Sequence, residues 1–170
     1  MNWIFKRAKQ FFRALTAEIS LDDEKYIMAH LSAAEQKLFF ALGLVDQFHS
    51  LKVAYTIERL IIQGKTGIDR EFLIRCALLH DIGKADARLT IRDKIFAVLV
   101  STFAPKLADE LEIKGNDAIY IYRNHAEIGA RKLQRLGLFE EAKLIARHHS
   151  PPRDDDSREL KLLKIADDEN

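Results

Sequence analysis

The chain has 170 residues, of which 48% are hydrophobic and 31% are charged. This balance is typical of a soluble globular protein and excludes a disordered or membrane-spanning chain. The net charge of +1 excludes a global electrostatic field that attracts nucleic acid, so any anion-binding site has to be local. The length predicts one domain that can bury a core of its own.

The first predicted element is a basic amphipathic helix over residues 3–19. Its aromatic side chains are expected to pack on the rest of the domain, and contact of residues 1–19 with a membrane surface or a partner is the alternative. Residues 1–45 are predicted to form N-terminal helices that pack on the core unit of residues 46–170, and the two parts together make one structural unit. The interleaved residues are Trp3, Phe5, Phe11, Phe12, Leu15 and Ile19 with Lys6, Arg7, Lys9 and Arg13.

Further along the chain, apolar residues recur at spacings of three and four, which predicts helices almost everywhere. Helix ends are predicted near 64–67, Pro105, Gly115 and Pro151, and Ser32 opens a helix with a capping-box pattern. The predicted fold is therefore all-α, a compact single-domain helical bundle. The predicted helices cover residues 3–19, 23–30, 32–46, 49–62, 69–80, 91–102, 117–135, 138–148 and 157–168.

Cys76 is the single cysteine of the chain, and it lies inside the apolar run 72–79. One cysteine cannot form an internal disulfide, so a reducing compartment is the simplest interpretation, and we expect a cytoplasmic protein. The thiol itself is expected to be a small buried core group.

Five polar residues project from core-facing apolar stripes of predicted helices, and Asp81 directly follows one of them. Residues three or four apart share a helix face, so His49 lies in line with Val53, and Asp167 with Leu163. Buried carboxylates are rare because an unpaired interior charge is heavily penalised. This convergence indicates a metal ion shared by imidazoles and carboxylates, with hydrogen-bonded core histidines as the alternative. The six residues are His49, His80, Asp81, His125, His148 and Asp167.

His80 and Asp81 are adjacent at a predicted helix end, so both side chains can reach one point. Because a carboxylate has two oxygens, Asp81 can bridge two metal ions while His80 binds one. Mixed imidazole and carboxylate ligation suits Fe, Mn, Zn or Co. Two ions about 3.5–4 Å apart would clamp a phosphoryl oxygen and supply a bridging hydroxide as the nucleophile. Lys84 follows His80 by four residues, where its cation can neutralise a phosphate oxygen.

The order of His49, the pair His80-Asp81 and the late Asp167 resembles the HD-domain metal-dependent phosphohydrolase superfamily. Residues 77–84 read ALLHDIGK, which is similar to the HDIGK motif that gives the HDIG members their name. The resemblance implies a helical bundle of the HD-domain type in which these four residues hold one metal ion.

The resemblance extends over residues 46–168 and also implies a second metal ion. Family members with two additional histidines between the HD pair and the final aspartate hold that ion, bridged by the HD aspartate, and His125 and His148 match these positions. The doublet of His148 and His149 looks like that of the HD-GYP cyclic-dinucleotide phosphodiesterases. The Gly-Tyr-Pro signature of those enzymes is absent, because residues 150–152 read SPP. Hydrolysis of cyclic di-GMP is therefore not expected.

Val45 stands four residues before His49, where members with a third metal have glutamate, so we expect two metals. His149 is a candidate metal ligand, a hydrogen-bond donor to a ligand, or a substrate contact. Arg88 and Arg131 are candidate contacts for substrate phosphates, and a solvated basic face is the alternative for both.

The leading functional hypothesis is a metal-dependent phosphohydrolase that cleaves a phosphate ester or anhydride of a small molecule, with a nucleotide as the expected substrate. Asp81 and Lys84 are the predicted catalytic residues. The expected cofactors are two divalent transition metal ions, Fe, Mn, Co or Zn, with Mg as an alternative. A metal-binding HD signalling module with little catalysis, and a di-iron oxygenase of the same fold, remain the competing hypotheses because the ligand set is common to all three.

Overall fold

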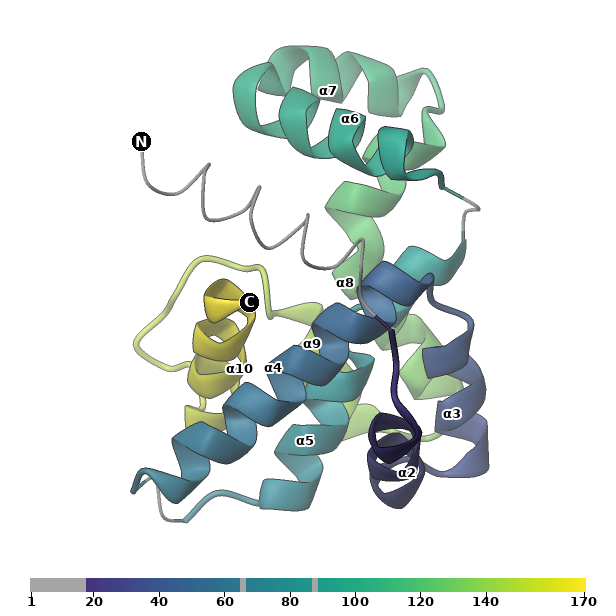
Figure 1. Cartoon of the computed structure of the whole chain (residues 1–170). Helices are drawn as coiled ribbons and strands as arrows, with labels where there is room; N and C mark the ends of the chain where they lie inside the picture. Colours follow the sequence, from purple (N-terminus) through teal and green to yellow (C-terminus); the bar gives the residue numbers. More distant parts are fainter. Residues whose placement is uncertain (1–17, 65–66, 87–88) are drawn as a thin grey trace.

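The computed structural model describes residues 18–64, 67–86 and 89–170. Across these residues the chain is all-α, as the sequence predicted, and no strand occurs. A short 3-10 helix, η1 (Ile82–Asp86), follows α5. The α-helices are α2 (Leu21–His30), α3 (Ala33–Phe40), α4 (Leu44–Ile62), α5 (Arg70–Leu79), α6 (Ile91–Phe103), α7 (Pro105–Ile113), α8 (Asp117–Arg135), α9 (Phe139–Ala146) and α10 (Arg158–Glu169), shown in Figure 1.

Side-chain caps define where most of these helices begin. Ser20, Ser32 and Thr90 each accept a hydrogen bond from the backbone N–H three residues later, and an aspartate or glutamate at that position closes the capping box. The capping box predicted at Ser32 is therefore confirmed. Asp69 and Asn116 cap α5 and α8 in the simpler way, through one side-chain acceptor.

The predicted helix over 32–46 is wrong, because the structure divides this segment into two helices. α3 ends at Phe40, and Gly43 has an extended backbone at the N-cap of α4. The chain turns between these points, so the helix predicted to start at His49 begins five residues earlier, at Leu44. A lone glycine inside an apolar pattern is tolerated in many helices, which is why the pattern did not reveal this break.

The helix α7 and the 3-10 helix η1 were not predicted. Pro105 occupies the first turn of α7, where its missing N–H is not needed, so this proline begins a helix directly after α6 has ended. Of the predicted helix 3–19, residues 1–17 lie outside the described part of the chain. The described residues 18 and 19 are not helical.

The main core lies where α4 and α5 pack against each other and against α9 and α10. Leu51, Ile57, Leu73, Leu78 and Ile145 are fully buried there. α2 and α3 pack on α5 from the other side, and α8 packs on α9 and on η1. Cys76 is buried in the same core, as predicted, and burial raises the pKa of its thiol well above the ordinary value.

α6 and α7 form a hairpin at the top of Figure 1, and α8 runs from this hairpin down into the body of the molecule. The hairpin and the first turn of α8 share a small core of their own, built from Ala97, Ala108, Ala118 and Ile119. α8 therefore connects two packing units and carries side chains to both. None of the helices in the described ranges combines the length and apolar character that a membrane span requires.

Candidate metal centre

The structure brings together all six residues that the sequence singled out. His49 lies in the second turn of α4, and His125 lies in the middle of α8. His80 is the C-cap of α5 and Asp81 follows it, so the adjacent pair does lie at a helix end. His148 follows the end of α9, and Asp167 belongs to the last turn of α10. The ligand atoms of these residues form overlapping groups whose members lie within 4.8 Å of one another.

The first group is centred on Asp167. His49 Nε2 lies 2.9 Å from Asp167 Oδ1, and His80 Nε2 lies 3.6 Å from the same oxygen. Asp81 Oδ2 completes this group, at 3.8 Å from His49 Nε2 and 3.5 Å from His80 Nε2. Two imidazole nitrogens and two carboxylate oxygens therefore face one point.

The second group consists of Asp81, His125, His148 and His149. His125 Nε2 lies 3.3 Å from Asp81 Oδ1 and 3.0 Å from His149 Nε2. The His148 ring packs against the rings of both His125 and His149. His149, for which the sequence left three roles open, thus lies within the cluster, although about half of its side chain, 47%, is exposed.

Asp81 is the residue that the two groups share. Its Oδ2 faces His49 and His80, whereas its Oδ1 faces His125. The carboxylate is buried, and it lies between the two sets of imidazoles. This is the arrangement that a carboxylate needs if each of its oxygens is to bind a different ion.

Backbone carbonyls orient three of the imidazole rings. The Nδ1 atoms of His80, His125 and His148 lie 2.8, 2.9 and 2.7 Å from the carbonyl oxygens of the residues three positions earlier. Because a carbonyl oxygen only accepts, each Nδ1 carries the proton and donates it. In the neutral form of such a ring the Nε2 atom is unprotonated, and this is the form in which histidine binds metals.

Several polar atoms of the cluster are buried without a hydrogen-bond partner. They are the Nε2 atoms of His80 and His148 and the Oδ1 atom of Asp81. An unsatisfied buried polar group costs about 1–3 kcal/mol, so three at one point need an explanation. Divalent cations would bind these lone pairs, so the buried histidines and aspartates fit a site that holds metal ions.

The charges of the metal-free cluster are coupled. Burial raises the pKa of the Asp81 carboxyl, but the facing charges of His80 and Lys84 outweigh burial and hold this pKa well below its usual range. Burial lowers the pKa of His80, yet the nearby carboxylates of Asp81 and Asp167 raise it to about 9. Burial lowers the pKa of His148, and the neighbouring His149 lowers it further. The pKa of Asp167 is also held well below its usual range, although burial raises it, because hydrogen bonds with the facing histidines outweigh burial. The carboxylates of Asp81 and Asp167 are therefore anionic at neutral pH, as metal ligands must be.

Lys84 is the cation nearest to the shared carboxylate. It lies on η1, and its Nζ donates to Asp81 Oδ2 at 2.5 Å. About a quarter of its side chain, 24%, is exposed, so Lys84 lies between the cluster and the solvent. η1 thus places a positive charge at the edge of the site.

Arg88 and Arg131 are the remaining candidates from the sequence. Arg88 lies outside the described residues. Arg131 is exposed on α8, roughly 120° around the helix axis from His125, and the described structure shows no contact between it and the cluster. Its predicted contact with substrate stays a prediction. His30, which matched no family position, pairs with Glu71 at 2.7 Å away from the cluster.

Two ionic residues with functional contacts, the half-buried Lys132 and the buried Asp156, were not found from the sequence. Lys132 donates to the carbonyl oxygen of Ile82 at 2.9 Å and pairs with Asp86, so it fastens both ends of η1 to α8. Asp156 is buried in the loop before α10 between Arg147 and Lys164. Lys132 follows His125 by seven residues on the same face of α8, a spacing that could have revealed it, whereas an aspartate in an acidic run is usually solvated.

The comparisons with known proteins agree with this geometry. A family model described as HD domain matches residues 48–169, a range that contains all six clustered residues. Comparison with curated proteins and with solved structures gives no significant match.

Proposed function

The chain belongs to the HD-domain family, and from this premise we propose that it is a metal-dependent phosphohydrolase that cleaves a phosphate ester or anhydride of a small molecule. The observation that carries the proposal is the position of Asp81, whose two oxygens face two different sets of imidazoles. The unpartnered Nε2 atoms of His80 and His148, one in each set, support it further.

We assign one ion to each set of side chains. His49, His80 and Asp167 with Asp81 Oδ2 would hold the first ion. Asp81 Oδ1 with the histidines of the second group would hold the other, and these are His125, His148 and His149. Imidazole and carboxylate donors without thiolate suit Fe, Mn, Co or Zn, with Mg as a weaker match for so many nitrogens.

A pair of divalent ions would act as Lewis acids on a phosphoryl oxygen and lower the pKa of a water molecule between them. The chain itself supplies orientation and charge. The carbonyl bonds to the Nδ1 atoms keep the rings of His80, His125 and His148 fixed before substrate arrives. Lys84 could exchange its partner Asp81 for a phosphoryl oxygen, because its side chain is partly exposed at the edge of the cluster. There it would stabilise the negative charge that develops during transfer.

The proposed substrates are small phosphate compounds, and nucleotides are the first class to test. The experiment measures phosphate release from a nucleotide panel by the wild-type chain loaded with Mn, Fe, Co or Mg. The matched variants are His80→Ala and Asp81→Ala, with His30→Ala as the control outside the cluster. We expect metal-dependent release from the wild type and from His30→Ala, and none above background from the two cluster variants.

Two other results would each favour a different function. Metal binding with tight nucleotide affinity but without phosphate release would indicate a binding module. Oxygen consumption by the iron-loaded chain would indicate a di-iron oxygenase. Phosphate release that survives in metal-stripped Asp81→Ala would contradict the proposed chemistry altogether.

A further inference from the structure

We propose that Asp156 is a positioning residue of the metal centre, which fixes His148 and His149 relative to Asp167. This inference rests on the proposed metal site, although Asp156 itself touches no member of the cluster in the described structure. It concerns the segment 150–157, which connects the end of α9 to the start of α10 and has no helical turn of its own.

The contacts of Asp156 reach both ends of that segment. Its Oδ1 accepts from Arg147 Nη2 at 2.5 Å, and its Oδ2 accepts from Lys164 Nζ at 2.8 Å. The same Oδ2 also accepts from the backbone N–H of Arg153 at 3.2 Å. One carboxylate therefore joins the end of α9, the connecting loop and the body of α10. We call these contacts of Asp156 with Arg147, Arg153 and Lys164 the clamp.

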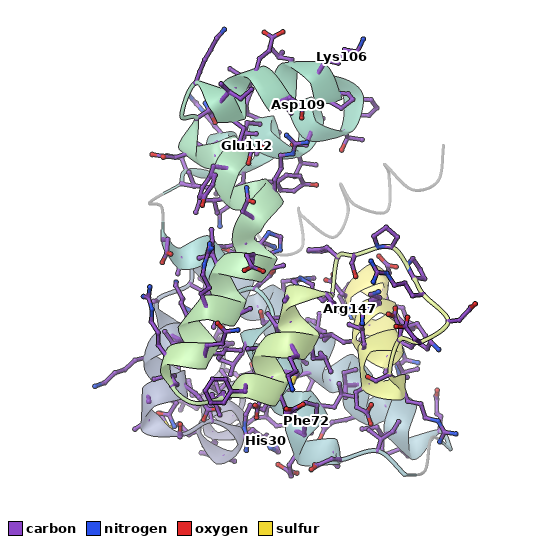
Figure 2. The ribbon with its side chains drawn as sticks, turned by 180° about the vertical axis from the view of Figure 1, so that it is seen from behind. His30, Phe72, Lys106, Asp109, Glu112 and Arg147 are labelled. Carbon is purple, nitrogen blue, oxygen red and sulfur yellow. The ribbon has the colours of Figure 1, made fainter. Side chains whose placement is uncertain are left out.

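The Asp156 side chain is fully buried, whereas its partners are partly exposed, Arg147 at 35% and Lys164 at 13%. Burial of a carboxylate is costly unless charged hydrogen bonds compensate for it, and here two cations do so. Moving Arg147 or Lys164 away from Asp156 would leave the buried carboxylate without a partner, so the three side chains stay in one arrangement. Arg147 lies beside the segment that leads into α10 (Figure 2).

The partners of Asp156 are neighbours of the proposed ligands. Arg147 directly precedes His148, and Lys164 lies one helical turn before Asp167. His148 and His149 follow the last turn of α9, where the His148 N–H donates to the Ile145 carbonyl oxygen at 3.3 Å. This bond lies within the end of α9, so the position of the two histidines relative to α10 depends on other contacts. His149 Nδ1 lies 3.9 Å from Asp167 Oδ2, which is the distance that the clamp has to preserve.

Loss of the clamp should therefore act on metal binding more than on folding. In metal sites, residues that orient the ligands typically contribute a factor of about 10–100 to metal affinity. The test replaces the charge without changing the size of the side chain, as Asp156→Asn. The matched control is Glu141→Gln, because Glu141 is also a buried carboxylate on this side of the molecule and pairs with Arg75 at 3.0 Å, away from the loop 150–157.

The experiment titrates Co²⁺ into the full metal-free chain in competition with a chelator and records the ligand-field absorption of bound cobalt. Thermal unfolding of each metal-free variant is followed in parallel. We expect about a 10–100-fold weaker cobalt affinity and an altered spectrum for Asp156→Asn. For Glu141→Gln we expect wild-type affinity and spectrum despite a comparable loss of thermal stability.

The outcomes separate this inference from the proposed function. If the wild type binds no cobalt, the proposed metal centre fails. If the wild type binds cobalt and the folded Asp156→Asn binds it equally well with the same spectrum, the positioning role is overturned and Asp156 is a purely structural ion-pair residue. If Asp156→Asn does not fold, Lys164→Met removes one arm of the clamp and is judged by the same two readouts against Glu141→Gln.

Discussion

The backbone of Gly83 lies directly against the backbone of His125. A Cβ atom placed on Gly83 would stand 2.0 Å from the His125 carbonyl oxygen, closer than any real Cβ contact. This approach brings η1 onto α8, so that Asp81 Oδ1 comes to 3.3 Å from His125 Nε2. The absent side chain of one glycine thus decides whether the shared carboxylate reaches the second group of histidines.

Gly83→Ala is expected to push η1 away from α8. Overpacking of this kind costs about 1–3 kcal/mol of stability, and here it also separates Asp81 from His125. We expect a lower free energy of unfolding in urea and a lower affinity for the second metal ion. Gly43→Ala is the control, because its new Cβ would make only ordinary contacts at 3.6 Å. A Gly83→Ala variant with wild-type stability and full metal content would contradict the structure at this point.

The two metal groups should be separable by substitution. His49→Ala removes a donor from the first group and His148→Ala removes one from the second, so each variant is expected to retain about one equivalent of metal where the wild type holds about two. Asp81→Ala should weaken both sites, since its oxygens face both groups. The measurement is elemental analysis after gel filtration. His30→Ala, at a position labelled in Figure 2, should keep the wild-type content.

Lys84 should matter for turnover and not for metal retention. Lys84→Met removes the ammonium group that would face the transferred phosphoryl, and loss of one such stabilising group typically lowers kcat by about 10²–10³-fold. Metal content should remain at the wild-type level, because no carboxylate or imidazole is lost. Lys143→Met is the matched control, since Lys143 pairs with Glu140 on the surface with 70% of its side chain exposed. Equal kcat values for the two variants would show that Lys84 takes no part in catalysis.

The capping box at the start of α2 predicts a pH effect on stability. Burial raises the pKa of Asp23, but hydrogen bonds from Tyr55 and Ser20 outweigh burial and lower it below the ordinary 3.8. A carboxyl with a lowered pKa in the folded state stabilises the protein above its unfolded pKa, and this contribution is lost on acidification. The wild type should therefore be more stable than Asp23→Asn near neutral pH, and this difference should shrink as the pH falls below about 4.

The measurement for this prediction is the free energy of unfolding of both chains in urea between neutral pH and about pH 3. Asp22→Asn is the control, because Asp22 has a side chain that is 90% exposed and a surface pairing with Lys25. A difference between wild type and Asp23→Asn that stays constant with pH would show that the carboxylate charge is not the stabilising feature.

Much of the fold could be predicted from spacing alone, because helices are local. The helix end predicted at Gly115 and the periodicity that follows it gave a helix over 117–135, and α8 has these bounds. The break at Gly43 and the short helix α7, which begins at Pro105, were missed for a different reason. Glycine and proline are compatible with more than one backbone path, and the choice between paths depends on what packs against them.

The sequence by itself determined which side chains are available for the site, since helical periodicity and the HD motif singled out His49, His80, Asp81, His125, His148 and Asp167. Only the tertiary structure decided how these side chains meet. The orientation of the Asp81 oxygens, the inclusion of His149, the contact between Gly83 and His125 and the clamp at Asp156 all join segments far apart in the chain. Periodicity tells which face of its own helix a residue occupies, whereas the packing of whole helices against one another decides which faces come together.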